Sequence, residues 1–155
     1  MRLLYFPLVV LLLFFSSSCN EDDSSSPGSG DTRNIPPESM RADVDLIRRD
    51  YLTVYSLNSS GNITLVGAMD NSGADQITIS LNETTLAGTY SFPSNEVILD
   101  FYQAGTLYAP TNGQIIINSH NTLEKRVIGT FQFDAVALLG GSTVQVINGQ
   151  FNISY

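Results

Sequence analysis

Few residues of this chain are suited to acid–base, nucleophilic or metal-dependent chemistry. His120 is the only histidine among the 155 residues, and Cys19 is the only cysteine. No cysteine or acidic residue lies within three positions of His120, so the spacing of a metal site is missing. A Ser/His/Asp triad needs no fixed spacing, but the sequence contains no G-x-S-x-G elbow. We therefore expect no catalytic residue, no metal and no cofactor, with a hydrolase as a distant alternative. We expect His120 to lie exposed in a loop over Ser119–Leu123.

The stretch Asp70–Asp75 offers two interpretations. It reads DNSGAD, which places two carboxylates and an amide in a short segment, and calcium prefers such oxygen ligands. Gly73 does not fit the calcium loop of helix-loop-helix proteins, and Asn, Ser, Gly and Asp are the ordinary residues of a turn. The turn is the interpretation that we favour.

Tyrosines are the best candidates for ligand contacts. Tyr90 and Tyr102 fall in predicted strands and Tyr108 lies between two of them, and a ring with a polar tip at a surface suits carbohydrate or protein contacts. The alternative is that these rings are half-buried strand residues, since tyrosine favours strands. The chain has no tryptophan, which weakens the case for a sugar-stacking platform.

The segment before Cys19 has the layout of an export signal. Arg2 is its only charge, Leu3–Phe15 has no charged or strongly polar side chain, and Ser16–Ser18 precede the cysteine. The apolar run is shorter than the roughly 20 residues that a membrane-spanning helix needs. Small residues before a lone cysteine resemble a bacterial lipoprotein signal, although Ser16 stands where leucine is commonest. The resemblance implies a signal peptide over residues 1–18 and a membrane anchor of acyl chains on Cys19.

Residues 19–39 predict a flexible tether, and residues 40–155 predict one domain. The tether is rich in Ser, Gly, Pro and acids, and such a segment buries too little apolar surface to order itself. Removing residues 1–18 leaves six basic residues against 15 acidic ones, a formal charge of −9. Because so acidic a surface repels phosphate backbones, we expect no nucleic-acid partner and no membrane contact other than Cys19.

Residues 40–155 read as an all-β domain. Short alternating runs of β-branched and aromatic residues recur between Gly, Asn, Ser and Pro, which predicts an antiparallel β-sandwich or short barrel of about eight strands. In GTFQFDA, Phe131 and Phe133 share one face, which we expect to be buried. Asp43–Ile47 is a candidate for a further strand. The eight predicted strands are Leu52–Leu57, Ile63–Met69, Gln76–Leu81, Gly88–Phe92, Val97–Tyr102, Gln114–Asn118, Arg126–Val136 and Thr143–Tyr155.

The last strand contains an ambiguity at Asn148-Gly149. This dipeptide is a strong hairpin signal. Alternatively, Gly140-Gly141 forms the hairpin, and Asn148-Gly149 is a bulge that reverses which side chains face the core.

Four motifs resemble an uncharacterised family of Bacteroidetes-type lipoproteins, small all-β domains of unknown function. They are GTY (88–90), GQIIINS (113–119), GTFQFDA (129–135) and the ending NGQFNISY (148–155). In that family a G-T-F-x-F strand precedes a last strand with N-G-x-F, which favours the bulge. The family often has a G-x-x-W segment near the domain start, where this chain has MRADVDLIRRDY, so the first strand is the least defined. The resemblance implies no catalytic residues.

The acidic residues after Cys19 give the expected location. Glu21, Asp22 and Asp23 resemble the surface-export signal of Bacteroidetes-type lipoproteins in position and charge, which implies an outer-membrane protein that faces the cell exterior. We expect a surface-exposed binding or assembly domain, with an envelope protein or a glycan as its partner. The alternative is a purely structural component of the envelope.

Overall fold

The computed structural model describes residues 35–155. The predicted signal peptide, Cys19 and the acidic residues Glu21, Asp22 and Asp23 lie outside the described residues. Within them the chain forms ten strands and no helix. The strands are β1 (Ser39–Val44), β2 (Ile47–Tyr51), β3 (Thr53–Ser59), β4 (Asn62–Ala68), β5 (Gln76–Asn82), β6 (Gly88–Ser91), β7 (Val97–Gln103), β8 (Thr106–Asn121), β9 (Arg126–Ala137) and β10 (Thr143–Ser154).

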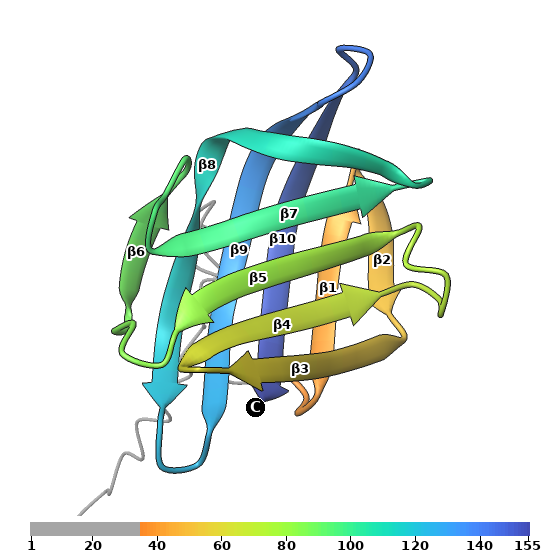
Figure 1. The fold of residues 1–155 in the computed structure, drawn as a ribbon. Coiled ribbons are helices and arrows are strands. Elements are labelled where there is room, and N and C mark those ends of the chain that lie inside the picture. Colours follow the sequence, from red (N-terminus) through yellow and green to blue (C-terminus); the bar gives the residue numbers. More distant parts are fainter. Residues whose placement is uncertain (1–34) are drawn as a thin grey trace, which may run out of the picture.

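The strands form one antiparallel sheet that folds over on itself into a nearly closed barrel. Its order is β2-β1-β10-β9-β8-β7-β5-β4-β3, and β6 pairs with β8 beside this path. Figure 1 shows β3, β4, β5 and β7 as one layer that crosses over β9, β10, β1 and β2. Where β3 meets the end of β10, the Ser56 hydroxyl donates to the Ser154 carbonyl at 2.8 Å. The all-β fold predicted from the sequence is therefore confirmed, in its barrel form.

β8 makes the corner between the two layers. Its first residues pair with β7, Gln114–Ile117 pair with β6, and β9 pairs with it from Tyr108 to Asn121. The register shifts between Pro110 and Asn112, where the strand turns. Gly113 follows with a φ of 120°, and a Cβ there would lie 2.3 Å from the Gln132 carbonyl oxygen. Only glycine allows this close approach of β8 to β9.

Alternation along the strands fills the barrel. Phe131 and Phe133 are both 3% exposed, as predicted, and Phe133 meets the Phe101 ring at a centroid distance of 6.1 Å. The largest side chains that are fully enclosed are Phe151, Met40, Ile63, Leu65, Ile77, Ile79, Ile115, Ile117 and Ile153. They come from both layers, so one core holds the barrel together.

The bulge expected in the last strand is confirmed. The register between β10 and β9 shifts between Val146 and Gly149, so one extra residue lies on β10. Val144 and Val146 face the core before the shift, and Phe151 and Ile153 face it afterwards, although four residues lie between Val146 and Phe151, an even number that would put them on opposite faces of an unbroken strand. The reversal of side-chain parity is the effect of the extra residue.

Two boundaries and the number of strands differ from the prediction. Asp43–Ile47 is not a strand, because Asp45 and Leu46, both with positive φ, form the turn between β1 and β2. β8 begins at Thr106 rather than Gln114, since the strand continues through Pro110 and Gly113 by way of a bulge. β1 and β2 precede the eight predicted strands and bring the count to ten rather than about eight.

The folded part also begins before residue 40. Ile35 is 5% exposed, and its carbonyl accepts a hydrogen bond of 2.8 Å from the Asn152 side chain. β1 begins at Ser39 and pairs with β10. Residues 35–39, which the sequence assigns to the tether, are thus part of the domain.

Candidate functional site

A groove of about 740 Å³ lies on the outer face of β4, β5 and β7. This size falls within the range of about 300–1,000 Å³ that is usual for small-molecule sites. We call it the outer groove. Its lining is Asn62, Thr64, Ser80, Leu81, Asn82, Thr84, Thr85, Leu86, Tyr90, Asn95, Glu96 and Ile98.

The floor of the outer groove is a row of outward side chains across three paired strands. Thr64 on β4 is opposite Ser80 on β5, and Ser80 is opposite Ile98 on β7. The two hydroxyl oxygens lie 3.3 Å apart, and Ile98 is 52% exposed. The inward neighbours Ile63, Ile79 and Leu99 belong to the core, so the alternation that builds the barrel also presents this row of two hydroxyls and one apolar side chain to solvent.

The loop between β5 and β6, residues 83–87, forms one wall of the outer groove. The Asn82 side-chain oxygen accepts hydrogen bonds from the Thr84 amide (2.9 Å) and the Thr84 hydroxyl (2.8 Å). The Thr85 amide donates to the Asn82 carbonyl at 2.9 Å, and the Glu83 amide donates to the Gly61 carbonyl at 2.8 Å. Such side-chain and main-chain bonds are the stabilising contacts of an asparagine turn.

Two further contacts fix this loop from outside. The Tyr90 hydroxyl donates to the Leu86 carbonyl at 2.8 Å, and a ring nitrogen of His120 lies 2.7 Å from the Thr85 carbonyl. The Leu86 side chain nevertheless remains 76% exposed. The wall thus holds an apolar side chain in solvent at the rim of a polar groove.

His120 is not the exposed loop residue that the sequence suggested. It lies on β8, which continues to Asn121, and the register shift between Ile117 and Ser119 changes the direction of its side chain. After this shift His120 is opposite the buried Val127, so its ring faces inward at the end of the barrel. The prediction failed because a bulge reverses the side-chain parity and the sequence IIINSHN contains no residue that marks it.

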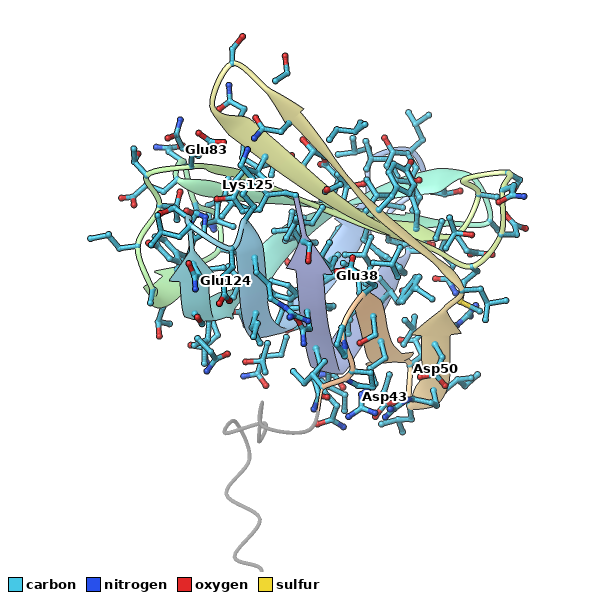
Figure 2. All side chains as sticks on the ribbon, turned by 90° about the horizontal axis from the view of Figure 1, so that it is seen from below. Glu38, Asp43, Asp50, Glu83, Glu124 and Lys125 are labelled. Atoms are coloured by element: carbon cyan, nitrogen blue, oxygen red, sulfur yellow. The ribbon has the colours of Figure 1, made fainter. Side chains whose placement is uncertain are left out.

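The ring of His120 joins three segments. Thr85 offers only a carbonyl oxygen, so Nδ1 carries the proton that it donates, and Nε2 accepts from the Tyr155 hydroxyl at 2.9 Å. The Tyr155 ring meets His120 edge to face at a centroid distance of 5.6 Å. Desolvation and the nearby Glu83 raise the pKa of Tyr155, so its hydroxyl stays protonated. Figure 2 shows this end of the barrel from below, with Glu83 and Lys125 labelled.

The three tyrosines proposed as ligand contacts lie in different places. Tyr90 lines the outer groove, where its ring also packs against the core. Tyr102 lies near the end of β7, opposite Leu107, and is half-buried. Tyr108 packs on Phe101 at a centroid distance of 5.7 Å, and its hydroxyl oxygen lies 3.2 Å from that of Ser142. Only Tyr90 belongs to the outer groove.

The carboxylates of Asp70–Asp75 accept hydrogen bonds from the protein. Asp70 accepts from the amide (2.8 Å) and the hydroxyl (2.6 Å) of Ser72, and these bonds lower the pKa of Asp70. Asp75 accepts from the Ala104 amide at 2.9 Å, which ties this turn to the turn between β7 and β8. In residues 35–155, no three His, Cys, Asp or Glu side chains gather in a way that could hold a metal ion.

The outer groove is lined by polar but mostly uncharged side chains. Glu96 is the only charged residue among those that line it. The remaining polar groups are the amides of Asn62, Asn82 and Asn95 and several hydroxyls, which both donate and accept hydrogen bonds. Sequence reasoning found Tyr90 but missed these amides, because they come from different strands and loops.

Within the described part of the chain, no helix has the length and apolar character needed to cross a membrane.

Comparison with known proteins gives a family and no function. Neither the curated proteins nor the solved structures contain a match to this chain. Residues 50–153 match a domain of unknown function, DUF6252, which fits the resemblance to an uncharacterised family. Because the match spans more than half of its 155 residues, the chain belongs to the DUF6252 family.

Proposed function

We propose that the protein is a lipoprotein of the outer membrane whose barrel acts as a binding domain at the cell surface. Acyl chains on Cys19 anchor it, and Glu21, Asp22 and Asp23 direct it to the exterior. The outer groove is the binding site. The sequence of residues 1–23 supports the location, and the geometry of the groove supports the binding role.

One observation carries the binding role: the outer groove combines polar floor groups with an apolar side chain fixed in solvent. Leu86 is 76% exposed although hydrogen bonds hold its own carbonyl and that of Thr85. An ordered loop loses little conformational entropy when a ligand arrives, so more of the contact energy appears as affinity. Convergent polar groups in a concave surface are the usual marks of a binding site.

The proposal includes no catalytic step. Both ring nitrogens of His120 are engaged, one by the Thr85 carbonyl and the other by the Tyr155 hydroxyl. A general base must lie within hydrogen-bond reach of the proton that it takes from its substrate, and both nitrogens of His120 face groups of the protein instead. The contacts of His120 therefore favour a role in holding the loop over a role in acid–base chemistry.

The binding role is tested by filling the outer groove. Ser80→Arg places a long side chain on the floor, and Gln132→Arg places the same side chain on the exposed face of β9 as a matched control. Each immobilised protein is incubated with solubilised cell envelope and with culture medium, and the retained material is compared. We expect wild type and Gln132→Arg to retain the same material and Ser80→Arg to lose it. Equal retention by all three folded proteins would contradict a binding groove and favour a structural component.

The anchor is tested separately by acyl labelling. Cells fed an alkyne-tagged fatty acid should label wild-type protein and leave Cys19→Ser unlabelled, because the lone cysteine is the proposed acylation site. Wild-type protein should sediment with membranes and the variant should not. Label on the variant, or none on the wild type, would refute the anchor.

A further inference from the structure

We infer that the outer groove binds an uncharged oligosaccharide. The inference rests on the proposed function only in taking the groove as a binding site. It adds the chemical class of the ligand, which the lining residues define.

The hydrogen-bonding groups of the outer groove match sugar hydroxyls. Asn62 and Asn95 present amides, each with a donor and an acceptor; Asn82 presents its side-chain NH2, since Thr84 occupies its oxygen; and Thr64, Ser80 and Thr84 add hydroxyls. A sugar hydroxyl also donates and accepts, so adjacent hydroxyls of one ring pair with such groups in either direction. A purely apolar ligand would leave these groups without partners when it displaced water, at a cost of about 1–3 kcal/mol for each buried group.

Apolar surface lies beside these polar groups. The Leu86 side chain is 76% exposed, Ile98 is 52% exposed, and the Tyr90 ring lines the same groove. A pyranose ring has a face of C–H groups as well as a rim of hydroxyls. Leu86, Ile98 and Tyr90 offer apolar surface against which this C–H face can pack. The groove can therefore contact both the C–H face and the hydroxyl rim of a sugar.

The charge of the groove disfavours anionic ligands. No basic side chain lines it, and Glu96 would repel a phosphate, a sulfate or a uronic acid. A carboxylate accepts hydrogen bonds from neutral hydroxyls, and such charge-assisted bonds are about twice as strong as neutral ones. Glu96 therefore favours an uncharged sugar for two reasons. It repels negatively charged ligands, and it accepts hydrogen bonds from sugar hydroxyls.

A peptide fits this groove less well. Extended peptides bind most readily at the open edge of a sheet, where main-chain groups are free to pair. β4 pairs with β3 and β5, and β5 pairs with β4 and β7, so these two strands of the floor have partners on both sides, whereas β7 pairs with β8 only over Phe101–Gln103. Over β4 and β5, only side chains remain to satisfy the main chain of a peptide lying on this face.

The test is a titration of the full chain carrying Cys19→Ser, observed by nitrogen-labelled amide resonances. The probes are neutral oligosaccharides of glucose, mannose and galactose, an oligogalacturonate as the acidic counterpart, and an unstructured peptide. We expect a neutral oligosaccharide to shift the amides of Asn62, Ser80 and Asn95. Asn95→Ala should weaken this binding about three- to tenfold, as loss of one hydrogen bond implies, while Gln132→Ala should leave it unchanged.

The outcomes separate the ligand class from the site. Groove shifts with the peptide or the oligogalacturonate alone would overturn the inference and leave the binding groove standing. Absence of groove shifts with every neutral oligosaccharide would overturn it too. The proposed function fails by a different result, which is equal retention of envelope material by wild type and Ser80→Arg.

Discussion

The Nε2 atom of His120 lies 2.9 Å from the hydroxyl oxygen of Tyr155, although 35 residues separate them in the chain. The other ring nitrogen reaches the Thr85 carbonyl, 35 residues away on the other side. One imidazole thus links the end of β10, the end of β8 and the loop that walls the outer groove. His120 is a positioning residue for that loop.

Replacement of His120 by alanine should therefore lower stability and loosen the loop. It removes two hydrogen bonds and leaves two partly buried partners unsatisfied, so we expect a loss of about 1–3 kcal/mol in the free energy of unfolding. Tyr155→Phe removes one bond and should cost less. In a double-mutant cycle the two changes should fall short of additivity, because they share one interaction. Fully additive losses in urea unfolding would show that the two side chains act independently. Faster hydrogen exchange at Thr84 and Thr85 in His120→Ala would confirm the effect on the loop.

Gly129 should be intolerant of any side chain. A Cβ there would lie 2.4 Å from both the Ile116 carbonyl oxygen and the Phe151 ring. Gly129→Ala should destabilise the protein by about 1–3 kcal/mol, as overpacking of a filled core does. Gly88→Ala is the matched control, because the nearest atom to its Cβ would be 3.9 Å away. Thermal unfolding of the two variants is the measurement. Equal midpoints would show that the core around residue 129 rearranges to accommodate the added methyl group.

The Asp100 carboxylate should oppose folding at neutral pH. Desolvation raises the pKa of Asp100, so the native state binds its proton more tightly than the unfolded state does. Stability therefore increases as the pH falls through the raised pKa, and the charged form is the costly one. Asp100→Asn should unfold at a higher midpoint than wild type at neutral pH, and the difference should shrink in acid. An advantage for the variant that is constant across the pH range would assign the gain to something other than this charge.

The sequence predicts most strands because alternation is a local property. Ile77, Ile79 and Leu81 read as one face and are buried as one face of β5. The failures occur where a bulge or a tight turn interrupts the alternation. Ser119 would face the core in an unbroken β8, but the register shift before it brings His120 there instead. Asp45 and Leu46 have positive φ without glycine, so nothing in the sequence marked the turn between β1 and β2.

The outer groove was beyond prediction for a different reason. Its amides come from β4, from β5 and from the segment before β7, and each alone reads as a turn or strand-end residue. Only the pairing of β5 with β4 and β7 brings them together. Tyr90 was predicted as a contact residue, because an aromatic residue among polar ones can be recognised from the local sequence. Pairing depends on contacts between residues that are distant in the chain. The sequence therefore predicts the type of each residue's local structure, but not which of these residues meet in the groove.

The orientation of the protein at the membrane gives the last prediction. Glu21, Asp22 and Asp23 begin two residues after the proposed acylation site Cys19, in a segment too polar to bury itself. An export apparatus reads such a tag only while the tag is accessible. We therefore expect protease added to intact cells to remove a C-terminal epitope from wild type and to spare it in a variant with alanine at residues 21–23.

Lysed cells and a variant with a protease site inserted in residues 24–34 provide the controls. They establish that the protein can be cut when the protease reaches it. An epitope that survives on intact wild-type cells, while the control site is cut after lysis, would place the domain in the periplasm and refute surface display. Equal loss from wild type and from the alanine variant would leave surface display in place and remove the acids as its cause. Loss of the epitope from wild type alone, with both proteins acylated at Cys19, would show that the lipid anchor and the acidic residues together bring the barrel to the cell surface.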